Sequence, residues 1–138
     1  MKPKNPPEDM PQVIPYLYYE DAGAAIDFME KAFGFDVESC FRNPDDGKVL
    51  HAKVRTGSGV IFVGPGMEFF GTRATSDPEF VSSMIYVFVE DVDAHYARVV
   101  AGGARMCAAW PDAVFSARRP AGKMRQGCNR AIHPIRVG

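Results

Sequence analysis

An internal repeat at an offset of 70 residues constrains the fold more than any other feature of the chain. At this spacing Tyr16 matches Tyr86, Glu20 matches Glu90, Asp21 matches Asp91, and Ala24 matches Ala94. In both copies a strand rich in β-branched and aromatic residues leads into Glu-Asp, a helix of about ten residues and then glycine. Glu-Asp alone could recur as a helix N-cap in any α/β protein. The shared order of strand, cap, helix and stop favours a duplicated unit.

The first copy predicts one strand, one helix and three further strands. Val13–Tyr19 reads as the first strand, and Asp21 is placed to cap a helix over Ala22–Phe33 that ends at Gly34. Turn-forming residues then separate three more strands, predicted at Phe35–Arg42, Lys48–Arg55 and Val60–Val63. The unit is therefore expected to form a sheet with one helix on one face.

Periodicity assigns the faces of these elements. The helix carries an apolar stripe made of Ile26, Met29 and Phe33. The strand at 48–55 alternates, with Leu50, Ala52 and Val54 on one face and His51, Lys53 and Arg55 on the other. This strand is therefore expected to have one apolar face and one polar face.

The second copy predicts the same beginning. Met84–Val89 reads as a strand, and a helix from about Val92 to Ala101 ends at Gly102-Gly103. Ala104–Ala109 begins a further strand. Two curved sheets of this kind, each with its helix on one face, would enclose a cleft between them if they lay side by side. Clefts between units are common sites for small ligands.

Longer stretches resemble a known family. Val13–Asp21, continued by Ile26–Phe35, is similar to the vicinal oxygen chelate superfamily, which includes glyoxalase I, bleomycin-resistance proteins and extradiol dioxygenases. Val49–Lys53 and Val89–Ala97 resemble its PhnB-like branch. The resemblance implies an α+β fold of two tandem βαβββ modules that form a curved mixed sheet with a cleft.

The resemblance also implies a division of the chain. We expect a flexible leader at 1–11 and a single glyoxalase-like domain at 12–138, with module one at 12–66, a loop at 67–81 and module two at 82–138. The resemblance ends after Met106, and we expect residues 107–138 to form an atypical C-terminal part of module two. An altered C-terminus, for example from a shifted reading frame, and ordinary divergence with irregular strands both remain open.

The resemblance locates a potential metal site. Enzymes of the superfamily hold a divalent metal with His, Gln or Glu on the first and last strands of each module, which places ligand positions here at Ile14, Phe62 and Met84. None of these side chains has the oxygen or nitrogen donor that such an ion needs. Cys40, Cys107 and Cys128 form no zinc-type motif. We therefore expect no metal and no cofactor.

The same strand positions predict the lining of the cleft. Alternation directs Ile14, Tyr16, Tyr18, Met84, Tyr86 and Phe88 toward it, and places Val13, Leu17, Ile85, Val87 and Val89 under the helices. Aromatic rings with phenol tips suit a flat, partly polar ligand. The candidate ligand-binding residues are Tyr16, Tyr18, Phe62, Tyr86 and Phe88. The alternative, that these rings only fill the sheet interior, stays open.

His51 is the candidate catalytic residue, because an imidazole can act as a general base or as a ligand donor near neutral pH. The alternative is a half-buried strand histidine without chemistry. His95 lies within the second predicted helix and is expected to face solvent or to pack with Tyr96, and His133 lies in the atypical segment.

Composition narrows the class of function. No apolar run is long enough to span a bilayer and residues 1–11 have no signal-peptide pattern, so a cytoplasmic protein without membrane contact is expected. Residues 1–104 carry a net −7 and residues 105–138 a net +6, but no nucleic-acid motif accompanies the basic segment. We therefore expect no nucleic-acid partner.

These observations favour a metal-free protein that binds a small organic ligand, and the resemblance to bleomycin-resistance proteins implies a homodimer. The alternative is a metal-dependent lyase, isomerase or dioxygenase of the same superfamily. A scaffold that uses the basic segment for contact is a third hypothesis. Whether the chain is an enzyme, and which ligand it takes, is left open by the sequence.

Overall fold

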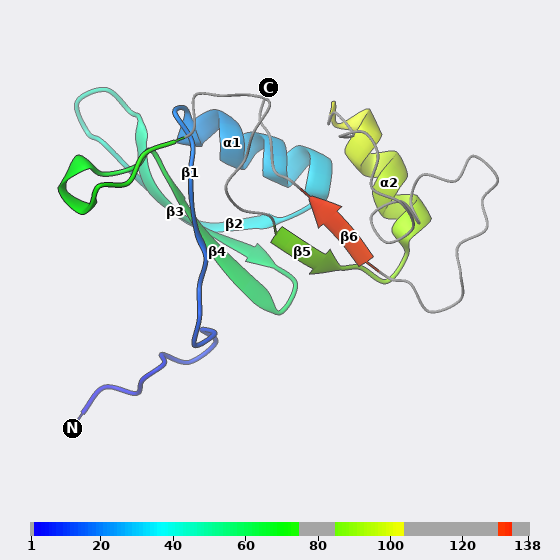
Figure 1. Ribbon diagram of the computed structural model, residues 1–138, viewed down its shortest axis with the longest axis horizontal. Coiled ribbons are helices and arrows are strands. Elements are labelled where there is room, and N and C mark those ends of the chain that lie inside the picture. The colour runs from blue at the N-terminus through cyan, green and yellow to red at the C-terminus, as the bar shows by residue number, and fades with distance from the viewer. Residues whose placement is uncertain (1, 75–84, 104–129, 134–138) are drawn as a thin grey trace. The chain divides into compact units, whose positions relative to one another are not determined.

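A computed structural model describes residues 2–74, 85–103 and 130–133 (Figure 1). The chain divides into two compact units. The described part of the first unit contains residues 2–30 and 34–74, and that of the second contains residues 31–33, 85–103 and 130–133. Helices and strands are mixed in both units, which confirms the predicted α+β class.

The first unit has the predicted order of one strand, one helix and three strands. Its elements are β1 (Tyr16–Tyr18), α1 (Ala22–Phe28), η1 (Met29–Phe33, whose last three residues belong to the second unit), β2 (Asp36–Arg42), β3 (Val49–Thr56), β4 (Gly59–Gly64) and η2 (Glu68–Phe70). The strands form one mixed sheet in the order β1-β4-β3-β2, with β1 parallel to β4 and the other pairs antiparallel. This is the βαβββ module expected from the sequence.

The helix of this module begins as predicted and ends differently. The Asp21 carboxylate accepts a hydrogen bond of 2.9 Å from the Ala24 N–H, which confirms the N-cap. The α-helix stops at Phe28, and the chain continues as the wider π-helical turn η1 up to Phe33. Gly34 then ends the helix with a φ of 70°, a conformation that glycine adopts without steric cost.

The core of the first unit lies between α1 and one face of the sheet (Figure 1). Ile26 and Met29 of the predicted helix stripe are 2% and 0% exposed, and the third stripe residue, Phe33, is 6% exposed and belongs to the second unit. The helix contacts β3 and β4, whose buried residues include Ala52, Val54, Ile61 and Val63. Since successive side chains of a strand point to opposite faces, the residues between these lie on the other face of the sheet.

Two face assignments from the sequence are wrong. Leu50 was expected on the same face as the buried residues Ala52 and Val54 but is 40% exposed, and Val49 is buried in its place at 4%. The cause is a register shift, because Phe41 pairs with His51 while Arg42 pairs with Val49. Leu50 is left between the paired positions, so alternation along β3 breaks there.

Val13 was expected under the helix, and it is 79% exposed. The first strand begins at Tyr16, three residues later than predicted. Strand alternation therefore does not extend to Val13. The shorter strand agrees with Pro15, which has no N–H to donate to a ladder.

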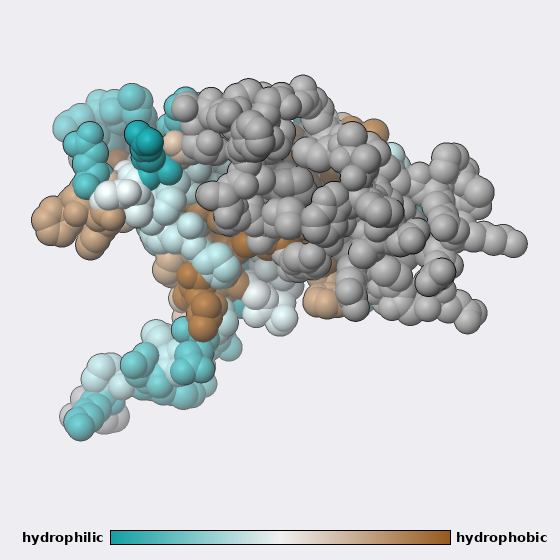
Figure 2. Space-filling view, in the orientation of Figure 1, coloured by the Kyte–Doolittle hydropathy of each residue, from teal (hydrophilic) through white to brown (hydrophobic). Residues whose placement is uncertain are grey.

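The loop after β4 brings apolar side chains to the surface (Figure 2). Met67, Phe69 and Phe70 are 39%, 91% and 66% exposed. The loop is closed by hydrogen bonds of 3.0 and 3.1 Å between the backbones of Met67 and Thr72. Phe69 and Phe70 are therefore exposed aromatic residues outside the sheet, suitable as controls for the half-buried aromatic residues within it.

The second unit reproduces the start of the repeat. Its described elements are β5 (Ile85–Phe88), α2 (Val92–Ala101) and β6 (Arg130–His133), with β5 antiparallel to β6. The Asp91 carboxylate accepts a 2.9 Å hydrogen bond from the Ala94 N–H, as Asp21 does from Ala24. The strand and capped helix predicted here are confirmed, whereas the strand predicted at Ala104–Ala109 lies outside the described residues.

His95 makes a contact that the sequence did not predict. Its ring stacks on Phe33 with the centroids 6.4 Å apart and an interplanar angle of 25°. Arg98, one turn further along α2, donates from Nε to the Lys31 carbonyl at 3.5 Å. Burial, and secondarily Arg98, lowers the pKa of His95. Helix periodicity could not predict this, because residues 31–33 come from a distant part of the sequence.

No helix among the described residues is long and apolar enough to cross a membrane.

Candidate functional site

Four predicted site residues meet on the sheet face that lies away from α1. Phe62 is the register partner of Tyr16 on one side and of Lys53 on the other, and Tyr18 is the partner of Gly64. Register partners share a face of the sheet. This aromatic face consists of Tyr16, Tyr18, His51 and Phe62, and all four side chains are half-buried.

The rings of the aromatic face form a continuous row of contacts, from Tyr18 through Tyr16 and Phe62 to His51. Tyr16 and Tyr18 stack with their centroids 4.8 Å apart and an interplanar angle of 15°. Phe62 presents T-shaped contacts to Tyr16 at 5.8 Å and to His51 at 4.7 Å. Offset-stacked and T-shaped pairs are the favourable arrangements of aromatic rings. Three predicted ligand-binding residues and the candidate catalytic residue are thus brought together.

A hydrogen bond orients His51. The Tyr16 hydroxyl oxygen lies 2.9 Å from His51 Nδ1. Burial, and secondarily Tyr18, raises the pKa of Tyr16, so this side chain stays a phenol. We assign the tautomer from acidity, because a phenol is the better donor and an imidazole nitrogen the better acceptor. Tyr16 then donates to Nδ1, and Nε2 of the neutral ring carries the proton and is a donor.

Gly64 makes room for this arrangement, and sequence reasoning missed it. A Cβ at Gly64 would lie 2.8 Å from the Tyr16 hydroxyl oxygen and 3.1 Å from Tyr16 Cε1. The Tyr16 ring therefore occupies the space that a side chain would fill. The strand predicted at Val60–Val63 ended one residue before Gly64. A glycine within a strand is itself a signal for close approach, and here it is the last residue of β4.

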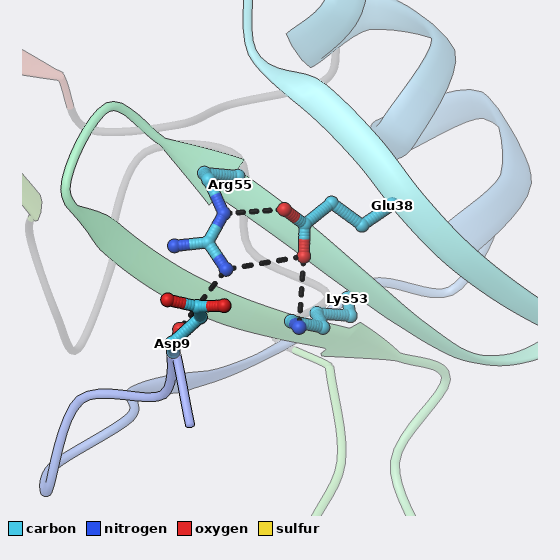
Figure 3. Close-up of polar contacts among 4 residues, drawn as sticks. All are labelled: Asp9, Glu38, Lys53 and Arg55. Atoms are coloured by element: carbon cyan, nitrogen blue, oxygen red, sulfur yellow. Dashed lines mark hydrogen bonds and ion pairs between the residues drawn. The ribbon is translucent and has the colours of Figure 1, made fainter. Parts of the chain in front are cut away.

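Figure 3 shows a charged cluster made of Glu38, Lys53 and Arg55. It adjoins the aromatic face, because Lys53 is the register partner of Phe62. Arg55 donates to the Glu38 carboxylate through Nε and also through Nη2, the second contact at 3.2 Å. Lys53 Nζ lies 2.8 Å from the same carboxylate. Lys53 and Arg55 were expected on the face of His51. Glu38 was not, because its position depends on a register shift between Val37 and Ser39.

The charged cluster also contacts the N-terminal segment. Arg55 Nη2 donates a 3.1 Å hydrogen bond to the Asp9 carbonyl oxygen (Figure 3). Asp9 lies within residues 1–11, which were expected to form a flexible leader. The segment therefore has one defined hydrogen bond to the sheet.

The charged cluster predicts a pH dependence of stability. Hydrogen bonds from Arg55 and then Lys53 lower the pKa of Glu38 from its ordinary 4.5 to about 2. Between these values the unfolded chain binds a proton at Glu38 and the folded protein does not. The free energy of unfolding therefore rises with pH in this window, and the contribution is lost as pH falls through the folded pKa.

We expect Glu38→Gln to remove this contribution, so that the difference in stability between wild type and variant shrinks from pH 4.5 toward about 2. Urea unfolding at a series of pH values measures it. Glu20→Gln is the control, because Glu20 is exposed and forms no ion pair within the described residues. If both variants showed the same pH profile, the ion pairs of Glu38 would not exist in solution.

The side chains at the metal-ligand positions that the family resemblance assigned have no donor atoms suited to a divalent metal. Phe62 has a hydrocarbon ring there, and Ile14 is a half-buried aliphatic residue before β1. Met84 lies outside the described residues. Within the part of the chain that the structure describes, no three His, Cys, Asp or Glu residues gather in a group that could hold a metal ion.

The remaining predicted site residues are in the second unit. Tyr86 and Phe88 both lie in β5, and Phe88 is 73% exposed while its neighbour Val87 is 8% exposed. The alternation predicted for this strand is therefore present at these two positions. The side chain of Tyr86 is outside the described part of the structure.

Comparisons with known proteins place these features in a family. The Glyoxalase/Bleomycin resistance protein/Dioxygenase superfamily matches residues 11–120. The match continues past Met106, the last residue of the resemblance described above. The crystal structure of TioX from Micromonospora sp. ML1 is similar at 31% identity, covering 67% of this chain and 70% of that one, with a TM-score of 0.43.

Two mycobacterial proteins are similar to this chain over most of its length. The uncharacterized protein Mb0911c of Mycobacterium bovis is 30% identical over 112 residues, which cover 78% of this chain and 72% of the relative. The uncharacterized protein Rv0887c of Mycobacterium tuberculosis is also 30% identical over 112 residues, and the match spans 65% of its length. With most of its length matched by the family's own pattern and its βαβββ module in place, the chain belongs to the glyoxalase/bleomycin resistance protein/dioxygenase superfamily.

Proposed function

We propose that the protein binds a small organic molecule on the aromatic face without using a metal. One observation carries this proposal: the ring of Phe62, the residue to which the family resemblance assigns a metal-ligand position, packs against Tyr16 and His51. A phenyl ring in that position offers apolar contact surface instead of a donor atom.

The polar groups of the aromatic face support a partly polar ligand. Within the described residues the Tyr18 hydroxyl makes no hydrogen bond, and His51 uses only Nδ1, toward Tyr16. Half-buried donors of this kind gain from a ligand that bonds them. A flat ring that stacks beside Tyr18 and reaches His51 Nε2 would use both kinds of surface. Sequestration of the ligand, a homodimer and a cytoplasmic location complete the proposal and rest on family resemblance and composition.

A second function, catalysis with His51 as a base, is favoured by the Tyr16–His51 hydrogen bond. In the other tautomer Nδ1–H donates to the Tyr16 oxygen, and Nε2 has the lone pair that a base needs. Glutathione–aldehyde and catechol assays distinguish the two functions. If the wild-type protein shows turnover in one of these assays and His51→Ala abolishes it, the protein is an enzyme and the binding-only hypothesis is wrong.

Binding and metal content test the leading proposal together. A thermal-shift screen of planar aromatic compounds identifies ligands, and we expect Phe62→Ala to weaken their binding about tenfold, the effect of losing one aromatic contact. Phe70→Ala is the matched control, because Phe70 is 66% exposed on the loop after β4.

Equal affinities of the two variants would remove the aromatic face as the binding site. Metal analysis of the purified protein is the second readout. Tightly held stoichiometric Ni, Zn, Fe or Mn would overturn the metal-free proposal.

A further inference from the structure

We propose that the ligand of the aromatic face is an aromatic anion, a planar ring bearing a carboxylate or a comparable acid group, and that Lys53 binds the acid group. This inference rests on the proposed function and specifies its ligand class. It comes from the position and the charge of Lys53 relative to the rings.

The position follows from strand geometry. His51, Lys53 and Arg55 alternate along β3, so they share a face and are spaced by about 7 Å. Lys53 is the register partner of Phe62, and directly opposed residues on neighbouring strands have Cβ atoms about 5 Å apart. A ring stacked on the aromatic face therefore has the Lys53 side chain at its edge, within reach of a substituent.

The charge of the cluster favours an anion over a cation. Two basic side chains share the single carboxylate of Glu38, which gives these three residues a net charge of +1. The exposed Asp9 carboxylate interacts electrostatically with Arg55 and offsets part of that charge at the Arg55 end of the cluster, so the inference rests on Lys53. The Lys53 and Arg55 side chains are only 24% and 23% exposed, which limits the screening of this charge by salt. An aromatic cation would be repelled by the same cluster.

The groups with unused hydrogen-bonding capacity are donors. A lysine ammonium has three N–H donors, and within the described residues that of Lys53 contacts only Glu38. His51 presents Nε2–H when it accepts from Tyr16, and Tyr18 has a hydroxyl without a partner among the described residues. An acid anion offers only acceptors, and hydrogen bonds between charged groups are the stronger ones. The donors and the ligand class therefore match.

Three probes that share one ring system test the charge preference: naphthoate, naphthamide and naphthylmethylamine. Their affinities are measured by isothermal titration calorimetry with the full chain at about pH 8, where a carboxylic acid is ionised and a primary alkylamine is protonated. We expect naphthoate to bind about tenfold more tightly than naphthamide, and naphthylmethylamine to bind most weakly. The preference should decrease with added salt.

Variants of the charged cluster should change the preference in opposite directions. Lys53→Met keeps an unbranched apolar side chain and is expected to abolish the preference for naphthoate, whereas Lys53→Arg is expected to retain it. Glu38→Gln removes the competing negative charge and is expected to raise the affinity for naphthoate several-fold. Lys48→Met is the matched control, because Lys48 is exposed in the turn between β2 and β3, outside the site. Circular dichroism confirms that each variant is folded.

The outcomes separate the two proposals. If naphthamide binds as tightly as naphthoate, or if Lys53→Met keeps the preference, the anion inference fails while binding on the aromatic face stands. If none of the three probes binds, the proposed function fails and the inference fails with it.

Discussion

Replacing Met29 with alanine is expected to lower the free energy of unfolding by about 2–5 kcal/mol. Met29 is 0% exposed and is among the largest fully buried side chains of the described structure. It lies in the helix stripe, at the point where α1 continues into η1. The loss combines the transfer energy of the removed atoms with the cost of the cavity that remains. Urea unfolding followed by circular dichroism measures it.

Met67→Ala is the control for this prediction. The same atoms are removed at a residue that is 39% exposed on the loop after β4, so we expect a change within about 0.5 kcal/mol. A similar loss in both variants would show that Met29 is not part of the core in solution.

A side chain at Gly64 is expected to disrupt the aromatic face. The added Cβ of Gly64→Ala would meet the Tyr16 hydroxyl oxygen at 2.8 Å and the Leu50 carbonyl oxygen at 3.1 Å. The Tyr16 ring must move away, and its hydrogen bond to His51 is lost. Overpacking of this kind costs about 1–3 kcal/mol. The expected result is a changed ¹⁵N shift of His51 Nδ1, together with weaker binding of any ligand that uses the aromatic face.

Gly23→Ala is the contrasting control. Gly23 lies inside α1, and its added Cβ would make ordinary contacts of 3.4 and 3.5 Å with Asp21 and Val49. Alanine is the better helix former, so we expect stabilisation of up to about 1 kcal/mol and no change at His51. If Gly64→Ala left the His51 signal unchanged as well, the contact between Gly64 and Tyr16 would be refuted.

The two face assignments that failed mark the limits of periodicity. Ala52 and Val54 are buried as alternation predicts, but Leu50, on the same predicted face, is exposed. A single register shift in the pairing of β2 with β3 reverses the face at that point. The second shift in the same pair places Glu38 beside Lys53 and Arg55, and nothing local to residue 38 indicates it.

What the sequence determined by itself was local. The caps at Asp21 and Asp91, the buried helix stripe, and the shared face of Tyr16 and Tyr18 within their own strand follow from repeats of 3.6 and 2 residues and from capping chemistry. Neighbours in the chain control these features, so a single sequence displays them.

The tertiary structure decided which of these residues touch. The Tyr16–His51 hydrogen bond joins residues 35 apart in the chain, and the Arg55–Glu38 pair joins residues 17 apart. The place of Gly64 under the Tyr16 ring depends likewise on the parallel pairing of β1 with β4. Such contacts arise from the register of strands that pair across a distance, where a shift of one residue exchanges the faces of the sheet. Local periodicity is the same before and after such a shift, and for that reason only the folded sheet could show the site.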